Sequence, residues 1–279
     1  MKENILGIDL GGTSIKGGLV KGEALENITS RRIDPSGSEA QVLEEVFNFM
    51  DKLIDSSVTA IGIGVPGLAT DGVVYDVVNI PAWKRVPLQS LMQERYQLPV
   101  LVNNDANCFA LGEFYFGKGR GYGSMLGLTI GTGLGSGIII NKKLYAGNNC
   151  GAGEFGMMDY LDQCYEYYAS GQFFQNVYGI SGETVFEEAA AGSPVALKMY
   201  EEMGTHLGNA IKAILYALDI ELIVLGGSVR HAFNYFSEAM WKRIQTFAYT
   251  RALQSLKIEV SELQNSGILG AAALHYDHA

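Results

Sequence analysis

Two stretches of the chain share one pattern, LGIDLGGT at residues 6–13 and LGLTIGTG at residues 126–133. They align without gaps at an offset of 126 − 6 = 120 residues. In each stretch an apolar strand enters a glycine-rich turn, and a second apolar strand leaves it, over residues 15–20 and 137–140. Such glycines serve turns that need a positive φ or a close approach of the backbone to a neighbour. The repeated pattern predicts two lobes of like topology, each opening with a glycine-tipped hairpin.

The segments around these hairpins alternate between helix-like and strand-like patterns. Helical periodicity marks residues 40–54, 88–96, 106–116, 195–218 and 267–276, and short apolar strands are expected at 59–65, 99–102 and 222–225. After Gly151 the chain is expected to be mainly helical. Strands that alternate with helices are typical of a mixed α/β fold. A chain of 279 residues is also long enough for two lobes.

The composition argues against nucleic acid and membrane as partners. The net charge is −10, and an acidic surface repels phosphate backbones unless it carries a basic patch. The pair Arg31-Arg32 is isolated, and no such patch is expected. The first residues run directly into a strand-like segment, and the stretch 123–140 has too many glycines and threonines for a lipid-facing helix. With 3 scattered cysteines as free thiols, these features predict a cytoplasmic protein.

The first glycine turn has the chemistry of a phosphate site. Bare backbone N–H groups at Gly11 and Gly12 can point at phosphate oxygens, and the Thr13 hydroxyl can add a donor. The carboxylate of Asp9 would repel phosphate unless Mg²⁺ or its bound water lies between them. Candidate cofactor-binding residues in this turn are therefore Asp9, Gly11, Gly12, Thr13 and Lys16. A tight hairpin without a ligand is the alternative for this turn taken alone.

The second turn, with Gly131, Thr132 and Gly133, favours nucleotide binding. A dinucleotide-binding GxGxxG interpretation fails here, because a strand rather than a helix follows the glycines. Two hairpins that face each other would clamp a triphosphate from opposite lobes. A third loop at Gly226 and Gly227 would let a flat adenosine lie against the backbone. Together these loops predict ATP and Mg²⁺ as cofactors.

Asp105 follows a predicted strand and precedes a predicted helix, in the segment VNNDAN at residues 102–107. There its carboxylate can cap backbone N–H groups, and the helix dipole favours its ionised form. An ordinary N-cap is one interpretation. The other is a general base that accepts the proton of a sugar hydroxyl during in-line phosphoryl transfer.

Together these segments resemble the sugar kinases of the actin-like ATPase superfamily, specifically the ROK family (repressors, open reading frames and kinases). Residues 9–13 resemble the first phosphate motif of that family, 129–135 its second, 226–227 its adenosine motif and 267–273 the helix that links its lobes. Its sugar-side segments resemble residues 64–67, 79–83, 104–107, 151–156 and 166–171. The likeness covers essentially the whole chain, in the family's order.

The resemblance implies a two-lobed actin-like ATPase fold of ribonuclease H-like type. An N-terminal lobe is expected over residues 1–103, a C-terminal lobe over 104–266, and a helix that returns to the first lobe over 267–279. The resemblance also implies Asp105 as the catalytic base. Carboxylates and amides suit sugar hydroxyls, and sites built from them reject analogues that lack the hydroxyl. The residues that would hold the sugar are Gly67, Asn79, Asn104, Asp105, Glu154 and Glu166.

One departure from the family pattern concerns zinc. The family usually follows its Gly-Glu-x-Gly with a His that contacts the sugar and binds zinc, and then with a CxCGxxGC loop. Here Met157 stands at the His position, and only Cys164 matches a thiolate ligand. One thiolate cannot build a tetrahedral site, so no zinc is expected. Candidates to brace the shortened loop instead are Tyr160, Tyr165, Tyr167 and Tyr168. The histidines, expected on helix surfaces or in the tail, are His206, His231, His275 and His278.

The leading hypothesis is an ATP-dependent hexose kinase, glucokinase-like, that makes a sugar 6-phosphate. Alternatives within the enzyme class are fructose or an N-acetylhexosamine as acceptor, or polyphosphate as donor. A sugar-binding regulator or a silent scaffold is the non-enzymatic alternative. Regulators of the family carry an N-terminal DNA-binding domain, and none is expected before the first hairpin. The resemblance also implies a homodimer that binds a sugar and a nucleotide.

Overall fold

The computed structural model describes residues 4–77 and 79–278 of the chain. The chain divides into two compact units. Unit 1 comprises residues 1–121, 137–152 and 262–279, and unit 2 comprises residues 122–136 and 153–261. The first three residues, which bear on the expected lack of a leader, lie outside the described part. No described helix is both long and apolar enough to cross a bilayer.

Unit 1 is built on a five-stranded sheet with the strand order β3-β2-β1-β4-β8. These strands are β1 (Asn4–Leu10), β2 (Ser14–Lys21), β3 (Ala24–Arg32), β4 (Ala60–Val65) and β8 (Val100–Asn104). β1 pairs antiparallel with β2, and β1, β4 and β8 run parallel. The first predicted hairpin and the strands expected at 59–65 and 99–102 are thereby confirmed. β3 was not expected, because its side chains are mostly polar and exposed at the edge of the sheet.

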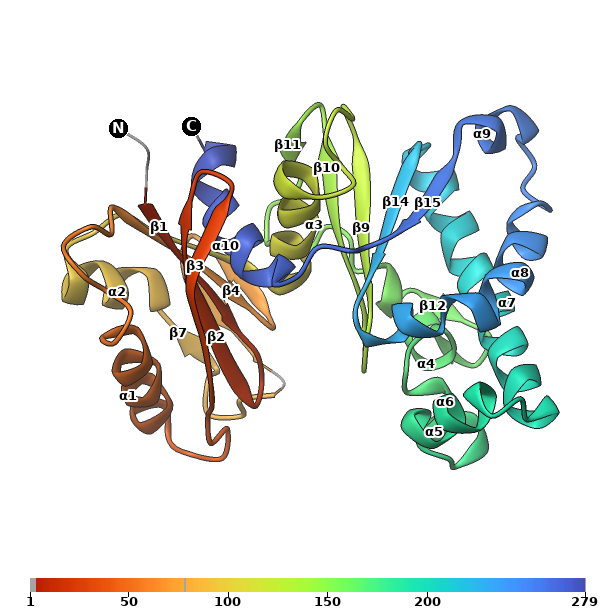
Figure 1. Ribbon diagram of the computed structural model, residues 1–279, viewed down its shortest axis with the longest axis horizontal. Helices are drawn as coiled ribbons and strands as arrows, with labels where there is room; N and C mark the ends of the chain where they lie inside the picture. Colours follow the sequence, from red (N-terminus) through yellow and green to blue (C-terminus); the bar gives the residue numbers. More distant parts are fainter. Residues whose placement is uncertain (1–3, 78, 279) are drawn as a thin grey trace. The chain divides into compact units, whose positions relative to one another are not determined.

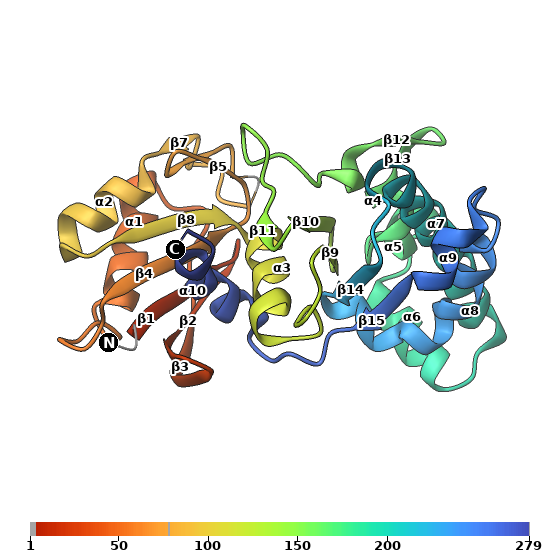
Figure 2. The same ribbon diagram turned by 90° about the horizontal axis from the view of Figure 1, so that it is seen from above.

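Helices cover both faces of this sheet (Figure 1). α1 (Glu39–Met50) and α2 (Leu88–Tyr96) pack on one face, where Leu6 and Ile8 of β1 join Phe49 in one apolar cluster. On the other face Ile5 packs with Leu269 of α10 (Ser266–His278), and α3 (Asp105–Phe116) packs on α10. Successive residues of a strand point to opposite faces, so β1 contributes to both layers. Figure 2 shows the same layers from above.

The face under α10 depends on glycine. A Cβ on Gly7 would lie 2.2 Å from the carbonyl oxygen of Ile268, and one on Gly62 would lie 1.9 Å from that of Ala271. Real Cβ atoms do not approach backbone so closely, so the small residues let the helix lie directly on the strands. The predicted helix over 267–276 is confirmed, with one further residue at its start and two at its end.

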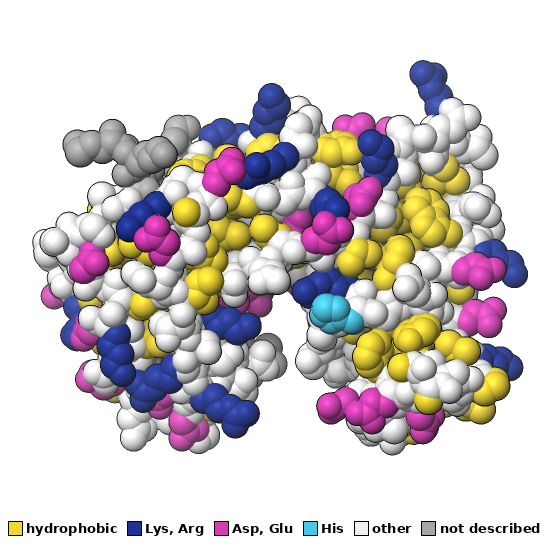
Figure 3. All heavy atoms as spheres, viewed as in Figure 1, with side chains coloured by type: hydrophobic (Ala, Val, Ile, Leu, Met, Phe, Trp, Pro, Cys, Tyr) yellow, Lys and Arg dark blue, Asp and Glu magenta, His cyan; other side chains and the backbone are white. Residues whose placement is uncertain are grey.

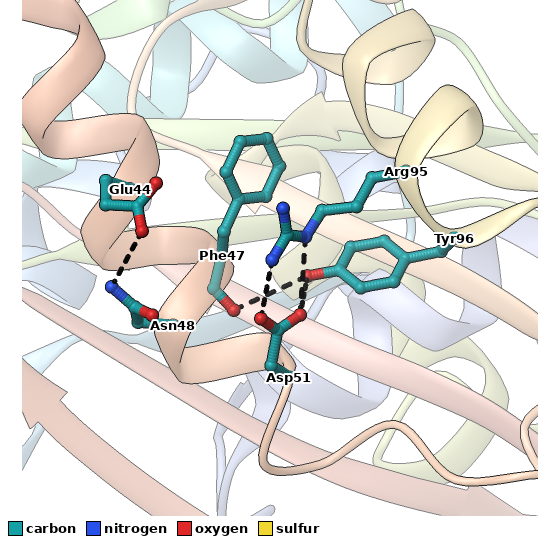
Figure 4. A network of polar contacts seen from close by, with 6 residues as sticks. All are labelled: Glu44, Phe47, Asn48, Asp51, Arg95 and Tyr96. Atoms are coloured by element: carbon teal, nitrogen blue, oxygen red, sulfur yellow. Dashed lines mark hydrogen bonds and ion pairs between the residues drawn. The ribbon is translucent and has the colours of Figure 1, made fainter.

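α1 and α2 are joined by a compact polar network (Figure 4). Asp51, the C-cap residue that follows α1, accepts hydrogen bonds from Arg95 Nη2 at 2.6 Å and from Tyr96 Oη at 2.9 Å. The Arg95 guanidinium lies 4.6 Å from the centre of the Phe47 ring. Burial, with the hydrogen bond to Asp51 as the next cause, raises the pKa of Tyr96 well above its usual range.

A small three-stranded sheet with the order β5-β6-β7 also belongs to unit 1. It is formed by β5 (Leu68–Thr70), β6 (Val73–Tyr75) and β7 (Arg85–Val86). β5 begins directly after Gly67, so this sheet carries the segment that follows the carboxyl end of β4.

The second five-stranded sheet has the order β11-β10-β9-β14-β15. It is formed by β9 (Met125–Ile130), β10 (Leu134–Ile140), β11 (Lys143–Leu144), β14 (Leu222–Gly226) and β15 (Lys257–Val260). β14 runs parallel to β9 and β15. The apolar stretch 123–140 is therefore a buried hairpin, as predicted, rather than a membrane helix.

The remainder of unit 2 is mainly helical, as expected after Gly151. The elements are η1 (Phe155–Met157), the β12 (Asp159–Tyr160) and β13 (Gln163–Cys164) hairpin, α4 (Tyr165–Ala169), α5 (Phe173–Tyr178), α6 (Gly182–Ala190), α7 (Pro194–Leu218), η2 (Ser228–Ala232), α8 (Phe233–Ile244) and α9 (Thr250–Ser255). α7 matches the predicted long amphipathic helix and begins with proline after the Ser193 cap.

Candidate functional site

The carboxyl ends of the parallel strands in unit 1 bring the first set of candidate residues together. Asp9 of β1 lies opposite Gly64 of β4, and Gly64 lies opposite Asn103 of β8. A Cβ on Gly64 would lie 3.7 Å from the Cα of Asp105. In open α/β sheets this edge is where ligands bind. The strand register therefore places Asp9 and Asp105 at one edge of unit 1.

The cap of α3 is Asn104, and Asp105 is the first residue inside the helix. The Asn104 Oδ1 accepts hydrogen bonds from the backbone N–H groups of Ala106 at 2.9 Å and Asn107 at 3.3 Å. Asp105 is exposed, and its own Oδ1 accepts from Ala106 N at 2.8 Å. The interpretation of Asp105 as the ordinary N-cap is therefore wrong. The sequence misled because asparagine and aspartate cap equally well and stand side by side here.

Side chains around this turn hold it in one arrangement. The Asn103 Oδ1 accepts hydrogen bonds from Asn107 Nδ2 at 2.9 Å and from the Cys150 thiol at 3.0 Å. The Asn104 Nδ2 donates to the carbonyl oxygen of Gly67 at 3.2 Å. Three predicted sugar-binding residues, Gly67, Asn104 and Asp105, thus lie together. Cys150 was predicted only as a free thiol, and its part in this network gave no signal in the sequence.

The first phosphate turn touches another candidate sugar residue. Gly11 N donates to Ser14 O at 2.8 Å and closes the turn. A Cβ on Gly12 would lie 2.2 Å from the Cβ of Asn79, so only glycine fits against that side chain. The side chains of Thr13 and Lys16 are exposed. Close approach, and not a positive φ, is therefore the reason for glycine at position 12.

Asp9 is partly buried at the end of β1, across the hairpin from Lys16. Burial raises the pKa of its carboxyl, and the Lys16 charge lowers it in part. A carboxylate taken out of water in this way gains from a nearby cation. This environment fits the predicted partner for Mg²⁺ at the first turn.

Unit 2 holds the second phosphate turn, and one segment of the chain fixes its shape. The Glu166 Oε2 accepts a hydrogen bond from Leu134 N at 2.9 Å. Gly171 N donates to Gly131 O at 2.7 Å, and Gln172 Nε2 donates to Thr132 O at 2.9 Å. A Cβ on Gly133 would lie 2.6 Å from Glu166 Oε2, so glycine is again required by close approach.

A cavity of about 840 Å³ opens beside this turn, within unit 2. It adjoins Gly131 and Thr132, and the η2 helix that follows Gly226 and Gly227 also lines it. Figure 3 shows hydrophobic side chains gathered over α5 and α6. The walls that sequence reasoning missed are Phe174, Gln175, Ser181, Glu183, Phe186 and Tyr200. Phe186 is 38% exposed on an amphipathic helix. This exposure indicates a binding cavity only once the fold is known.

Glu154 and Glu166 form a carboxylate pair in unit 2. Burial raises the pKa of Glu154, and the nearby Glu166 charge raises it further. Two neighbouring carboxylates suit a ligand rich in hydroxyl groups, because each oxygen can accept hydrogen bonds. Met157, three residues after Glu154, exposes 61% of its surface.

An aromatic cluster braces the shortened loop that carries these residues, as predicted for its tyrosines. Tyr160 stacks on Tyr165 with ring centres 4.4 Å apart, and its hydroxyl contacts His206 Nδ1 at 3.1 Å. Asn209 Nδ2 donates to the Tyr160 hydroxyl at 2.7 Å. The Tyr168 ring packs against His206, with ring centres 5.0 Å apart. α4, and with it Glu166, is thereby fastened to α7.

Two of the four histidines differ from expectation. The side chain of His206 is 14% exposed within the aromatic cluster, and burial lowers its pKa. His275 Nε2 contacts the carbonyl oxygen of Ile61 at 2.9 Å. His231 is exposed on η2, as expected, and it also lines the cavity. A helical histidine can lie on the buried face, and periodicity alone did not separate these cases. His278 is exposed, as expected for the tail.

Within residues 4–77 and 79–278, no group of three or more His, Cys, Asp or Glu side chains is placed to hold a metal ion. The three cysteines, two buried and one partly buried, are free thiols.

The chain is similar to known proteins over nearly its whole length. A family model described as the ROK family matches residues 5–278. The chain is 32% identical to the N-acetyl-D-glucosamine kinase of Yersinia pseudotuberculosis, over 96% of this chain and 98% of that protein. It is 29% identical to a glucokinase of Halalkalibacterium halodurans, over 96% and 94%. A ROK family glucokinase from Streptomyces griseus, solved with glucose and AMPPNP, superposes with a TM-score of 0.83 at 27% identity, over 97% and 98% of the two chains.

Proposed function

Because the chain belongs to the ROK family, we propose that it transfers the γ-phosphoryl group of ATP to a hydroxyl of a hexose or an N-acetylhexosamine. It is a sugar kinase with the actin-like ATPase fold that the sequence predicted. The observation that carries the proposal is the exposed Asp105 carboxylate at the strand ends of unit 1, on a helix that another residue caps.

Asp105 acts as the general base. Its carboxylate accepts the proton of the acceptor hydroxyl while the hydroxyl oxygen bonds to the γ-phosphorus. The bond between that phosphorus and the bridging oxygen breaks, and ADP leaves with the electron pair. In unit 1, Gly67, Asn79 and Asn104 are the proposed contacts for sugar hydroxyls. In unit 2, the carboxylates of Glu154 and Glu166 are proposed as hydroxyl acceptors.

The cavity in unit 2 takes the adenosine. Its aromatic side chains Phe174, Phe186 and Tyr200 suit a flat base, and its edge at Gly131 and Thr132 offers backbone and hydroxyl donors to phosphate. Gly226 and Gly227 lead into the wall formed by η2. The loop at Gly11 and Gly12 is the second group of phosphate donors, with Lys16 as the nearby cation.

Mg²⁺ bound to the nucleotide supplies charge neutralisation of the transferred phosphoryl group. Asp9 is the residue that would hold it, through water, because its partly buried carboxylate adjoins the first phosphate turn.

Glucose is the first candidate acceptor, because relatives of the chain are glucokinases, and an N-acetylhexosamine is the second. The exposed Met157 thioether favours the second candidate, because it cannot donate a hydrogen bond to a hydroxyl but can contact a methyl group. The relation to an N-acetyl-D-glucosamine kinase points the same way. Fructose as the acceptor and polyphosphate as the donor are the remaining alternatives, and the experiment below includes both.

The test is coupled detection of ADP release with MgATP and a panel of glucose, mannose, fructose, N-acetylglucosamine and N-acetylmannosamine. We expect one sugar to give a kcat/KM far above the others, and EDTA to abolish the signal. If calorimetry shows sugar binding but no ADP is released, the kinase hypothesis is wrong and a sugar-binding scaffold takes its place. Turnover with polyphosphate in place of ATP would correct the donor.

We also propose a cytoplasmic homodimer. Analytical ultracentrifugation of the pure protein tests the dimer, and a single species at the monomer mass of 30.2 kDa would overturn it.

A further inference from the structure

The second phosphate turn is held by one short segment rather than by its own hairpin alone. Three contacts reach it from residues 166–172: Glu166 Oε2 with Leu134 N at 2.9 Å, Gly171 N with Gly131 O at 2.7 Å, and Gln172 Nε2 with Thr132 O at 2.9 Å. Of the side-chain contacts, only that of Glu166 comes from a residue with a proposed place in the sugar site.

The segment is itself fixed at its other side. α4 starts at Tyr165, whose ring stacks on Tyr160, and Tyr160 contacts His206 of α7. Glu166 is the next residue along the helix. A carboxylate carried on a braced helix has less rotational freedom to lose when it binds. Binding of a ligand at one carboxylate oxygen of Glu166 can therefore restrict the position of the other oxygen.

We propose that Glu166 is a positioning residue that couples sugar binding to nucleotide binding by fixing the second phosphate turn. Its Oε2 holds Leu134 N, and its Oε1 takes a hydroxyl of the sugar. A carboxylate has lone pairs for both partners at once. The sugar half of this inference rests on the proposed function, whereas the contact with the turn does not.

The coupling has a definite sign. A sugar hydroxyl on Oε1 restricts the Glu166 side chain, and this keeps Oε2 on Leu134 N and the turn in its phosphate-binding shape. The sugar then binds the protein–nucleotide complex more tightly than it binds the free protein. The nucleotide likewise binds the protein–sugar complex more tightly than it binds the free protein. Such coupling is reciprocal, so each ligand must raise the affinity for the other by the same factor.

Electrostatic repulsion acts against this coupling. The negative charge of Glu166 lies beside a turn that is proposed to bind phosphate, and charge alone would weaken nucleotide binding. Glu166→Gln removes the charge but keeps an oxygen that accepts from Leu134 N. Glu166→Ala removes both. If fixing the turn dominates, only the alanine variant loses nucleotide affinity. If repulsion dominates, both variants bind nucleotide more tightly.

The experiment is calorimetric titration of Mg²⁺ and AMPPNP, with and without saturating glucose or N-acetylglucosamine. We expect the wild type to show coupling of about 5-fold or more. Without sugar, Glu166→Ala should bind AMPPNP about tenfold more weakly, as expected for the loss of a charged hydrogen bond, and its coupling factor should fall to about one. Glu166→Gln should recover most of the AMPPNP affinity.

Two further variants act as controls. Gln172→Ala removes the hydrogen bond to Thr132 O and a side chain of the cavity wall, so it should weaken AMPPNP binding and leave sugar binding without nucleotide unchanged. Glu238→Ala removes an exposed glutamate of α8 and should change neither.

AMPPNP binding by Glu166→Ala at the wild-type affinity, or tighter binding by both Glu166 variants, would overturn the inference. So would wild-type coupling that survives in Glu166→Ala. If the wild type binds none of the sugars, the proposed acceptor is wrong. Weak AMPPNP binding by Glu166→Ala would still support the role of Glu166 at the turn.

Discussion

Replacement of Asp105 by asparagine should separate catalysis from stability. The Asn104 cap holds the first turn of α3, and an asparagine Oδ1 at position 105 can still accept from Ala106 N. The folded state then loses a negative charge near a helix N-terminus, worth about 0.3–1 kcal/mol. For a protein of this size, about 1 kcal/mol shifts Tm by roughly 2–4 °C. We therefore expect a Tm within a few degrees of wild type and nearly normal sugar binding.

The rate of phosphoryl transfer should fall much further. General-base catalysis contributes about 10²–10⁴-fold, which corresponds to roughly 2.7–5.4 kcal/mol in the barrier. ADP release gives kcat, calorimetry gives the sugar Kd, and thermal melts give Tm. Asn104→Ala serves as the comparison for stability alone, because loss of the cap should cost about 0.5–2 kcal/mol. A D105N variant that binds sugar normally and turns over within a few-fold of wild type would refute Asp105 as the base.

Four other predictions follow from the same site. Since the pKa of Glu154 is raised, the sugar Kd should increase as pH falls through a value above the usual glutamate range, and Glu154→Gln should flatten that profile in calorimetry. Thr132→Val should weaken ATP use about 10-fold or more, a loss of about 1.5–3 kcal/mol, with little effect on sugar Kd; an unchanged KM and kcat for ATP would contradict the role of this turn. The pKa of His206 is lowered by burial, so the unfolded chain binds a proton that the folded chain refuses. Tm should therefore fall as pH drops through about 6.5, and should fall less in His206→Gln. Elemental analysis should find no zinc, and Met157→His should change the ranking of sugars by kcat/KM; an unchanged ranking would place Met157 outside the pocket.

Local patterns in the sequence predicted the parts of the site that depend on neighbours along the chain. Both glycine turns follow an apolar strand directly, and Asp105 stands at a strand-to-helix junction, so short-range chemistry was enough. The boundaries of α2 were predicted to the residue, because Pro87 and Leu98-Pro99 bracket its periodic stretch. The edge strand β3 carries too little apolar pattern to be predicted.

The features of the site that the sequence did not predict depend on contacts between residues that are distant along the chain. Gly12 meets Asn79, and Asn103 meets Cys150, which the sequence separates by dozens of positions. The walls of the cavity come from α5, α6, α7 and η2, whose rotation about their axes is set by packing. Periodicity gives an apolar face but does not say which exposed aromatic borders a cavity. His206 was misplaced for the same reason.

The discontinuity of unit 1 has a consequence for biosynthesis. Ile5 and Val20 are made early, but the helix that buries them, α10, is translated after every described element of unit 2. The apolar face of the first sheet that α10 covers therefore stays exposed to solvent until the residues before α10 have been synthesised. Exposed apolar surface of this kind favours aggregation. Synthesis on the ribosome should leave this protein dependent on a chaperone until the last helix arrives. Premature termination before Ser266 should yield insoluble chains, even though the residues of unit 2 are complete.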